Sequence, residues 1–135
     1  MQIFNYEENE FKDLCRKYGL LLVILHGSYA KGLNTPQSDI DVALLGDSKA
    51  IKDRFFDIIG DFSKVFGENF DPCFLNGAEA MITYHVAMDG RPLYEKTKGL
   101  FNAFKLAALS RYQDTKKFRL LEKAYVKSAI YRGAQ

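Results

Sequence analysis

The sequence has few of the features that mark secreted, membrane or zinc-binding proteins. Only two of its 135 residues are cysteines, and they lack the close Cys/His spacing of a zinc site, so both are predicted to be buried free thiols. The longest apolar run, Leu20 to Leu25, is too short to cross a bilayer. The first residues lack the basic-then-apolar order of a secretion signal. We therefore expect a cytoplasmic protein with no membrane association.

The chain also lacks a strong charge of one sign. Nineteen basic and seventeen acidic residues give a formal charge of +2, which does not indicate a nucleic-acid coat, so any anion binding must be local. There is no internal repeat, linker or low-complexity run. With 47% apolar and 27% charged residues, the chain is predicted to fold as a single domain, 1–135, with a core of about 10–115 and a C-terminal helical extension of about 116–132. The oligomeric state is left open.

Hydrophobic periodicity predicts four helical regions. They are a helix that follows an Asn5/Glu8 capping box and stops at Gly19, a helix capped by Ser48 with an apolar stripe running to Phe66, a short helix from Glu79 to Met88, and a region from Lys98 onward that forms two helices or one long bent helix. Glycines at positions 19 and 67 end the first two patterns.

Shorter segments between these helices are predicted to be strands. Leu20 to Leu25 is a continuous apolar run, as in a strand buried on both faces, and Ser38 to Leu45 alternates with a two-residue period. Asn69 to Leu75 contains Pro72, which favours an edge strand, and 92–94 is expected to be extended. The predicted fold class is α/β (α+β), a small mixed sheet with carboxylates on one face and helices on the other.

Asp39 and Asp41 form the centre of the candidate site. Residues two apart in a strand share a face and lie roughly 6–7 Å apart, so both carboxylates project together while Ile40 and Val42 face the other way. Neighbouring carboxylates repel each other unless a cation binds between them. Mg²⁺, or Mn²⁺, suits such a pair because it takes hard oxygen ligands and completes its shell with phosphates and water. An Asp-x-Asp alone also fits a polar strand edge.

The upstream turn favours the metal–nucleotide interpretation. Gly27 and Ser28 follow the buried strand and enter a short helix, so backbone N–H groups and the Ser28 hydroxyl can contact phosphate oxygens. Lys31 is either a phosphate ligand or a solvated surface lysine. No motif ties a base to Ser28, which argues against a nucleophile, and His26 is predicted to be structural. Asp71, on the next predicted strand, is the third acid, able to bind metal or accept a proton.

Gly27-Ser28, ten residues and then Asp39-x-Asp41, with a later strand acid, resembles the nucleotidyltransferase superfamily of kanamycin nucleotidyltransferase and DNA polymerase beta. Ala30-Lys31-Gly32, the Asp39-x-Asp41 strand and Leu93-Tyr94-Glu95 are most similar to its MNT (minimal nucleotidyltransferase) family, over roughly residues 10 to 115. The family commonly has an Asp-Leu-Val-like third strand, whereas here Pro72 follows Asp71.

This resemblance implies specific roles. Asp39, Asp41 and Asp71 would be the catalytic, metal-binding acids, and Gly27, Ser28 and Lys31 would bind the nucleotide. ATP would be the substrate, and AMP would be transferred to a tyrosine of a HEPN-domain ribonuclease toxin. The enzyme would then be a protein adenylyltransferase (EC 2.7.7.-) and the antitoxin of a toxin–antitoxin system.

Other functions are compatible with parts of this pattern. A small-molecule, aminoglycoside-type nucleotidyltransferase would use the same residues, although such enzymes usually carry an acceptor-binding domain. A non-catalytic antitoxin would not need three acids. Glycosyltransferases also use Asp-x-Asp, but in longer chains without the Gly-Ser turn, and a template-copying polymerase would need a basic nucleic-acid surface that is missing here.

Overall fold

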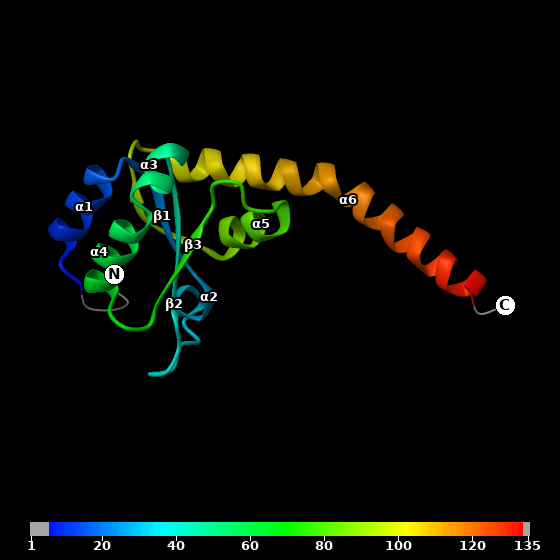
Figure 1. Cartoon of the computed structure of the whole chain (residues 1–135), viewed down its shortest axis with the longest axis horizontal. Coiled ribbons are helices and arrows are strands. Elements are labelled where there is room, and N and C mark those ends of the chain that lie inside the picture. The colour runs from blue at the N-terminus through cyan, green and yellow to red at the C-terminus, as the bar shows by residue number, and fades with distance from the viewer. Residues whose placement is uncertain (1–5, 134–135) are drawn as a thin grey trace.

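The computed structural model describes residues 6–133. Its elements are α1 (Glu8–Lys17), β1 (Leu20–His26), α2 (Gly27–Lys31), β2 (Ile40–Gly46), α3 (Ser48–Asp53), α4 (Phe55–Phe66), β3 (Phe70–Phe74), α5 (Ala80–Asp89), β4 (Arg91–Glu95) and α6 (Leu100–Gly133). Figure 1 shows a compact sheet-and-helix body from which α6 extends far to one side. Over the described residues, no helix combines the length and apolarity needed to cross a membrane.

The four strands form one mixed sheet in the order β3-β2-β1-β4. β1 pairs antiparallel with both β2 and β4, and β2 pairs parallel with β3. The mixed sheet was predicted, and β1 lies inside it, which explains why its residues are apolar on both faces. β3 is an edge strand, as Pro72 indicated, and the opposite edge strand β4 carries Pro92.

Helices cover both faces of the sheet. Alternate β2 residues Ile40, Val42 and Leu44 lie in a core with α1 and α4, which confirms the predicted two-residue period. That core includes the buried side chains Phe11, Cys15, Val23, Leu25, Ile58, Phe62 and Phe66. Leu22, Ile24 and Ala43 face the other way and pack with Val86 of α5 and Phe101 of α6. The acid-bearing face is therefore covered by α5 and α6 as well, where helices were expected on the opposite face alone.

Two predicted helix caps differ from the structure. Asn5 lies outside the described residues, and α1 begins after Glu7, whose side chain accepts a hydrogen bond from the Asn9 backbone N–H at 3.0 Å. The Ser48 cap is wrong, because Asp47 holds that position and accepts from the Ala50 N–H at 2.9 Å. Asp and Ser cap helices about equally well, so adjacent candidates cannot be separated from sequence alone.

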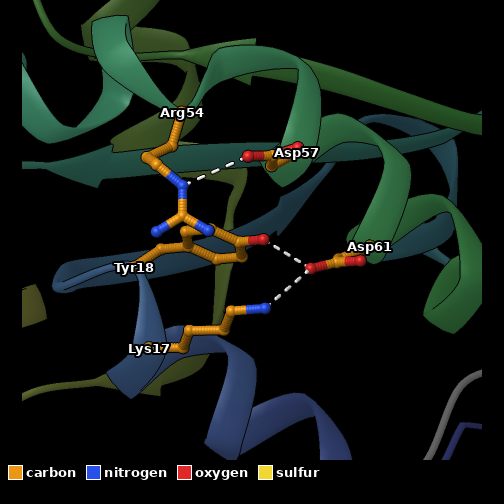
Figure 2. A network of polar contacts seen from close by, with 5 residues as sticks. All are labelled: Lys17, Tyr18, Arg54, Asp57 and Asp61. Atoms are coloured by element: carbon orange, nitrogen blue, oxygen red, sulfur yellow. Dashed lines mark hydrogen bonds and ion pairs between the residues drawn. The ribbon is translucent and has the colours of Figure 1, made fainter.

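The helix predicted from Ser48 to Phe66 is interrupted at Arg54 and forms α3 and α4. Phe55, placed by the sequence on the apolar stripe, is 37% exposed. Figure 2 shows that Arg54 leans over the Tyr18 ring, with its guanidinium carbon 5.1 Å from the ring centroid, while its Nε donates to Asp57 at 3.2 Å. The break thus coincides with a long-range contact that no local pattern reveals.

Tyr18 connects α1 to α4 through the polar network of Figure 2. Its side chain is 3% exposed, and its hydroxyl donates to the Asp61 carboxylate, which also lies 3.4 Å from the Lys17 Nζ. The hydrogen bond from Tyr18 lowers the pKa of Asp61, while burial raises the pKa of Tyr18. The network therefore favours an ionised Asp61 and a neutral Tyr18.

Tyr18→Phe is expected to lower the free energy of unfolding by about 1–2 kcal/mol, because a hydrogen bond to a charged acceptor is lost while the ring remains packed. Urea denaturation at pH 7 measures the change. Tyr131→Phe, on a side chain that is 69% exposed, is the matched control and should change stability by less than about 0.5 kcal/mol. Equal effects of the two substitutions would show that the network does not stabilise the fold.

The C-terminal region is one helix, α6, of 34 residues, which was one of the two predicted forms. Its first part packs on α5, where the rings of Tyr84 and Tyr112 stack at 3.9 Å. Phe101 and Ala108 are buried, but the residues from Leu120 to Gly133 are all exposed. Figure 1 shows this second part extending beyond the other elements.

Candidate active site

The turn between β1 and α2 forms one wall of the candidate site. His26 is extended, and Gly27 has φ +69°, a conformation that disfavours residues with a side chain. A Cβ atom at Gly27 would overlap the Oδ2 atom of Asp41. Glycine is thus favoured here for two reasons, its positive φ and the close approach of Asp41. Without a side chain at position 27, the Asp41 carboxyl packs directly against the turn.

The strand register brings Asp41 and Asp71 together. His26 is the partner of Asp41 across the β1–β2 ladder, and Asp41 is the partner of Asp71 across the parallel β2–β3 ladder. Pro72 does not disturb this alignment, because it lies directly opposite Val42. The neighbouring strands thus align, which is the condition under which Asp41 and Asp71 meet, whereas the roles of these acids stay predictions.

Asp39 lies just outside β2, which begins at Ile40 rather than at the predicted Ser38. A turn precedes it, in which the Thr35 N–H donates to the Ser38 Oγ at 2.8 Å. Asp39 is exposed, but its charge acts on Asp41. The three predicted acids therefore lie at the same end of the sheet, with Asp39 on its solvent side.

The carboxyl pair has an electrostatic cost in the absence of a cation. Burial, followed by a hydrogen bond with Asp71 and the negative charges of Asp71 and Asp39, raises the pKa of Asp41 to about 6. Protonated Asp41 donates to the Asp71 carboxylate, whereas ionised Asp41 repels it. A cation bound at the pair would remove this repulsion.

The donor set fits a hard divalent cation that shares its shell with a substrate. Within residues 6–133, no group of three or more His, Cys, Asp or Glu side chains is arranged to hold a metal ion. Mg²⁺, however, is commonly bound through one or two carboxylates, with phosphates and water as its other ligands. Asp41 and Asp71 supply two such carboxylates, and Asp39 is two residues from the first.

Ser28 and Lys31 lie on α2, beside the acids. Ser28 is half-buried, and no side chain caps the start of this helix. Lys31 is exposed at the helix end, where its Nζ lies 3.5 Å from the Asp89 carboxylate of α5. An exposed ion pair of this kind contributes about 0–1 kcal/mol, so Lys31 can exchange Asp89 for a phosphate at little cost.

Two residues of this region acquire importance only in three dimensions. Asp89, the partner of Lys31, was assigned no role from the sequence, and its distance along the chain gives no signal of this contact. His26 was noted next to the turn, and its Nε2 atom is buried without a hydrogen-bond partner among the described residues. Burial lowers the pKa of His26, while the negative charge of Asp71 opposes this shift.

The Gly27 contact can be measured with a matched pair of glycines. Gly27 and Gly32 have φ values of +69° and +72°, but a Cβ atom at Gly32 would meet open space. Gly32→Ala is expected to lower the free energy of unfolding by about 1–2 kcal/mol through backbone strain alone. Gly27→Ala should lose about 1–3 kcal/mol more, because the methyl group overlaps Asp41. Equal losses in urea denaturation would contradict the close packing of Asp41 on the turn.

Several solved structures similar to this chain are of toxin–antitoxin complexes. One is of a toxin–antitoxin with AMP-PNP: it is 25% identical, its TM-score is 0.69, and the alignment covers 92% of this chain and 98% of that chain. Another is a mutant of the toxin–antitoxin MntA–HpeT, with 25% identity, a TM-score of 0.67, and coverage of 93% and 99%. A third contains a tri-AMPylated Shewanella oneidensis HEPN toxin with an MNT antitoxin; at 23% identity, a TM-score of 0.59, and coverage of 91% and 95%, it shows similarity of fold alone.

The sequence itself matches a known family. No curated protein matches this chain significantly. The family described as "Polymerase beta, Nucleotidyltransferase" matches residues 9–99, from α1 to the segment after β4. This range contains the Gly27-Ser28 turn and all three aspartates, and it makes up more than half of the 135 residues. This chain therefore belongs to the polymerase beta nucleotidyltransferase family.

Proposed function

We propose that this chain transfers an adenylyl group from ATP to a tyrosine hydroxyl of a HEPN-domain ribonuclease toxin, and that it thereby acts as the antitoxin. The observation that carries the proposal is the Asp41–Asp71 carboxyl pair, packed against the Gly27-Ser28 turn in a member of a nucleotidyltransferase family. Similar structures contain AMP-PNP in one case and an AMPylated HEPN toxin in another, which supports ATP as the donor and a protein as the acceptor.

In this proposal the acids hold Mg²⁺ or Mn²⁺ together with the triphosphate. Asp41 and Asp71, with Asp39 at the solvent side, would ligate the metal, which supplies charge neutralisation on the phosphates. Backbone N–H groups at Gly27 and Ser28, the Ser28 hydroxyl and the Lys31 ammonium would contact phosphate oxygens. The pKa of Asp41, raised first by burial and then by Asp71 and Asp39, supports this arrangement, since a bound cation would offset these effects.

The protein needs only to position the reactants and to accept one proton. The tyrosine oxygen attacks the α-phosphorus in line, a new P–O bond forms, and the bond between the α-phosphorus and the α–β bridging oxygen breaks. Pyrophosphate leaves with the electron pair of that bond. The phenol proton passes to Asp71, which is exposed and can therefore be reached by an acceptor from outside.

Intact-mass spectrometry tests the proposal directly. The chain would be incubated with ATP, Mg²⁺ and the HEPN-domain protein expected to be encoded beside it. The partner should gain mass in steps of one adenylate and lose ribonuclease activity, and the Asp41→Asn chain should give neither effect. An unmodified partner, together with efficient labelling of an aminoglycoside, would overturn the proposal in favour of a small-molecule enzyme. If the Asp41→Asn chain inhibited the ribonuclease without adding adenylate to it, the chain would instead be a steric antitoxin.

A further inference from the structure

The second part of α6 exposes apolar side chains that the rest of the chain does not cover. Beyond Arg119 the helix extends away from the sheet and the other helices (Figure 1). Phe118, Leu121 and Tyr125 are 71%, 67% and 77% exposed, although their spacing places them on one side of the helix. We call residues 116–132 the α6 extension.

The α6 extension is anchored at its base. The guanidinium carbon of Arg119 lies 4.3 Å from the Tyr112 ring centroid, and the Tyr112 ring stacks on Tyr84 of α5. Arg111, about two turns before Arg119, donates to the backbone oxygen of Ala78 at 3.0 Å. These contacts fix the direction in which the helix leaves α5, so its exposed part is presented in a defined orientation.

Apolar residues of the α6 extension occur on more than one side. At 100° per residue, Val126 and Ile130 project from a different side than Phe118, Leu121 and Tyr125, and Leu120 and Tyr131 project from a third side. Their exposed fractions are 48%, 69%, 56% and 69%, respectively. A helix that is apolar on several sides is typical of a buried helix. A flat membrane surface would cover only one of these sides, so the distribution favours a protein that encloses the helix.

The charge of the α6 extension restricts the kind of partner. Residues 116–132 contain six basic residues and one acidic residue, Glu122, whereas the remainder of the chain has 13 basic and 16 acidic residues. A second copy of the helix laid against the first would bring two such positive segments together. An acidic surface is complementary to this charge.

Exposed apolar side chains and basic side chains occur together at two places along the helix. At the base, a groove of about 280 Å³ between α5 and α6 is lined by Met81, Tyr112, Lys116, Arg119, Leu120 and Lys123. Farther along, Arg119, Glu122, Lys123, Val126, Lys127 and Ile130 form an open surface on α6 alone. The two share Arg119 and Lys123, and basic and apolar side chains line both.

We infer that the α6 extension is the docking helix for the acceptor protein, which encloses it in an acidic groove lined with apolar side chains. This inference rests on the proposed function for the identity of the acceptor, the HEPN-domain protein. Docking by a segment separate from the aspartates gives the acceptor a high effective concentration at the site. The α6 extension lies outside the family-matched region, residues 9–99, and would supply a surface that binds the acceptor.

Calorimetric titration with the HEPN-domain protein tests this docking. Leu121→Asp is expected to weaken binding at least thirtyfold, while Leu106→Asp, at a 71% exposed position on the packed part of the same helix, should bind as the unaltered chain does. Lys123→Glu with Lys127→Glu should weaken binding at least tenfold and flatten its dependence on salt. Titration with ATP should be unchanged in all three variants.

Other outcomes separate this inference from the proposed function. Tight binding that depends on the α6 extension, without adenylyl transfer, would retain the docking helix and reject the proposed activity. Transfer to the HEPN-domain protein at the unaltered rate and affinity by Leu121→Asp would reject the docking helix and retain the activity. Docking to the acceptor would also be overturned if Leu121→Asp abolished self-association in sedimentation, or binding to phosphatidylserine vesicles, without weakening HEPN-protein binding.

Discussion

Asp41→Asn is expected to reduce adenylyl transfer by about a thousandfold or more while the protein becomes more stable in the absence of metal and nucleotide. The amide is a poor Mg²⁺ ligand and carries no charge to offset the cation. It still donates a hydrogen bond to Asp71, but no longer repels it. Transfer of labelled AMP measures the first effect, and urea denaturation at pH 7.5 the second.

The gain in stability should depend on pH. The folded-state pKa of Asp41 is raised to about 6, above the unfolded value of about 3.9. The folded state thus binds more protons between these values, and the free energy of unfolding contributed by this group falls as pH rises through that window. Asp41→Asn removes the fall, so the two stability curves should converge near pH 4 and separate above pH 6.

Asp114→Asn on α6 is the matched control for Asp41→Asn, since it removes an exposed carboxylate that lies away from the acids. It should leave both transfer and the pH dependence of stability unchanged. Full transfer by Asp41→Asn, or full transfer by the unaltered chain in EDTA, would reject a metal held by these carboxylates.

Asp71→Asn is expected to lower turnover by about a hundredfold to ten-thousandfold with a smaller change in ATP affinity, because in the proposed mechanism this acid would accept the proton of the attacking hydroxyl. Ser28→Ala should show the opposite pattern, weaker ATP binding with a modest loss of turnover, since in the proposed mechanism its hydroxyl would contact phosphate throughout the reaction. Single-turnover kinetics and calorimetric titration of both variants separate the two effects. Normal turnover by Asp71→Asn would show that another group accepts the proton.

The strands and the aspartate pair could be predicted because short-range patterns determine them. The apolar run of β1, Gly27 after that run and the alternation in β2 indicated the end of the sheet at which the acids lie. The alignment of Asp41 with Asp71 needed one further assumption, that β2 and β3 are neighbours, and the structure confirms that they are.

Features that depend on distant residues could not be predicted in this way. The break at Arg54 involves Tyr18, which precedes it by 36 residues, and the Lys31–Asp89 ion pair joins α2 to α5. Sequence spacing also does not show which aromatic residues of α6 are covered: Phe101 is buried and Tyr112 stacks on Tyr84. Tyr125 is 77% exposed, because α6 continues past the elements that could cover it.

The prolines at the two edges of the sheet affect how molecules of this protein can aggregate. Pro72 in β3 and Pro92 in β4 each remove a backbone donor from an outer strand, which disfavours a continuous ladder with a strand from another molecule. Edge-to-edge growth into fibrils is therefore disfavoured at both ends of the sheet. At high concentration, excess chains made without a partner should cluster through their helices, as amorphous and reversible assemblies rather than amyloid.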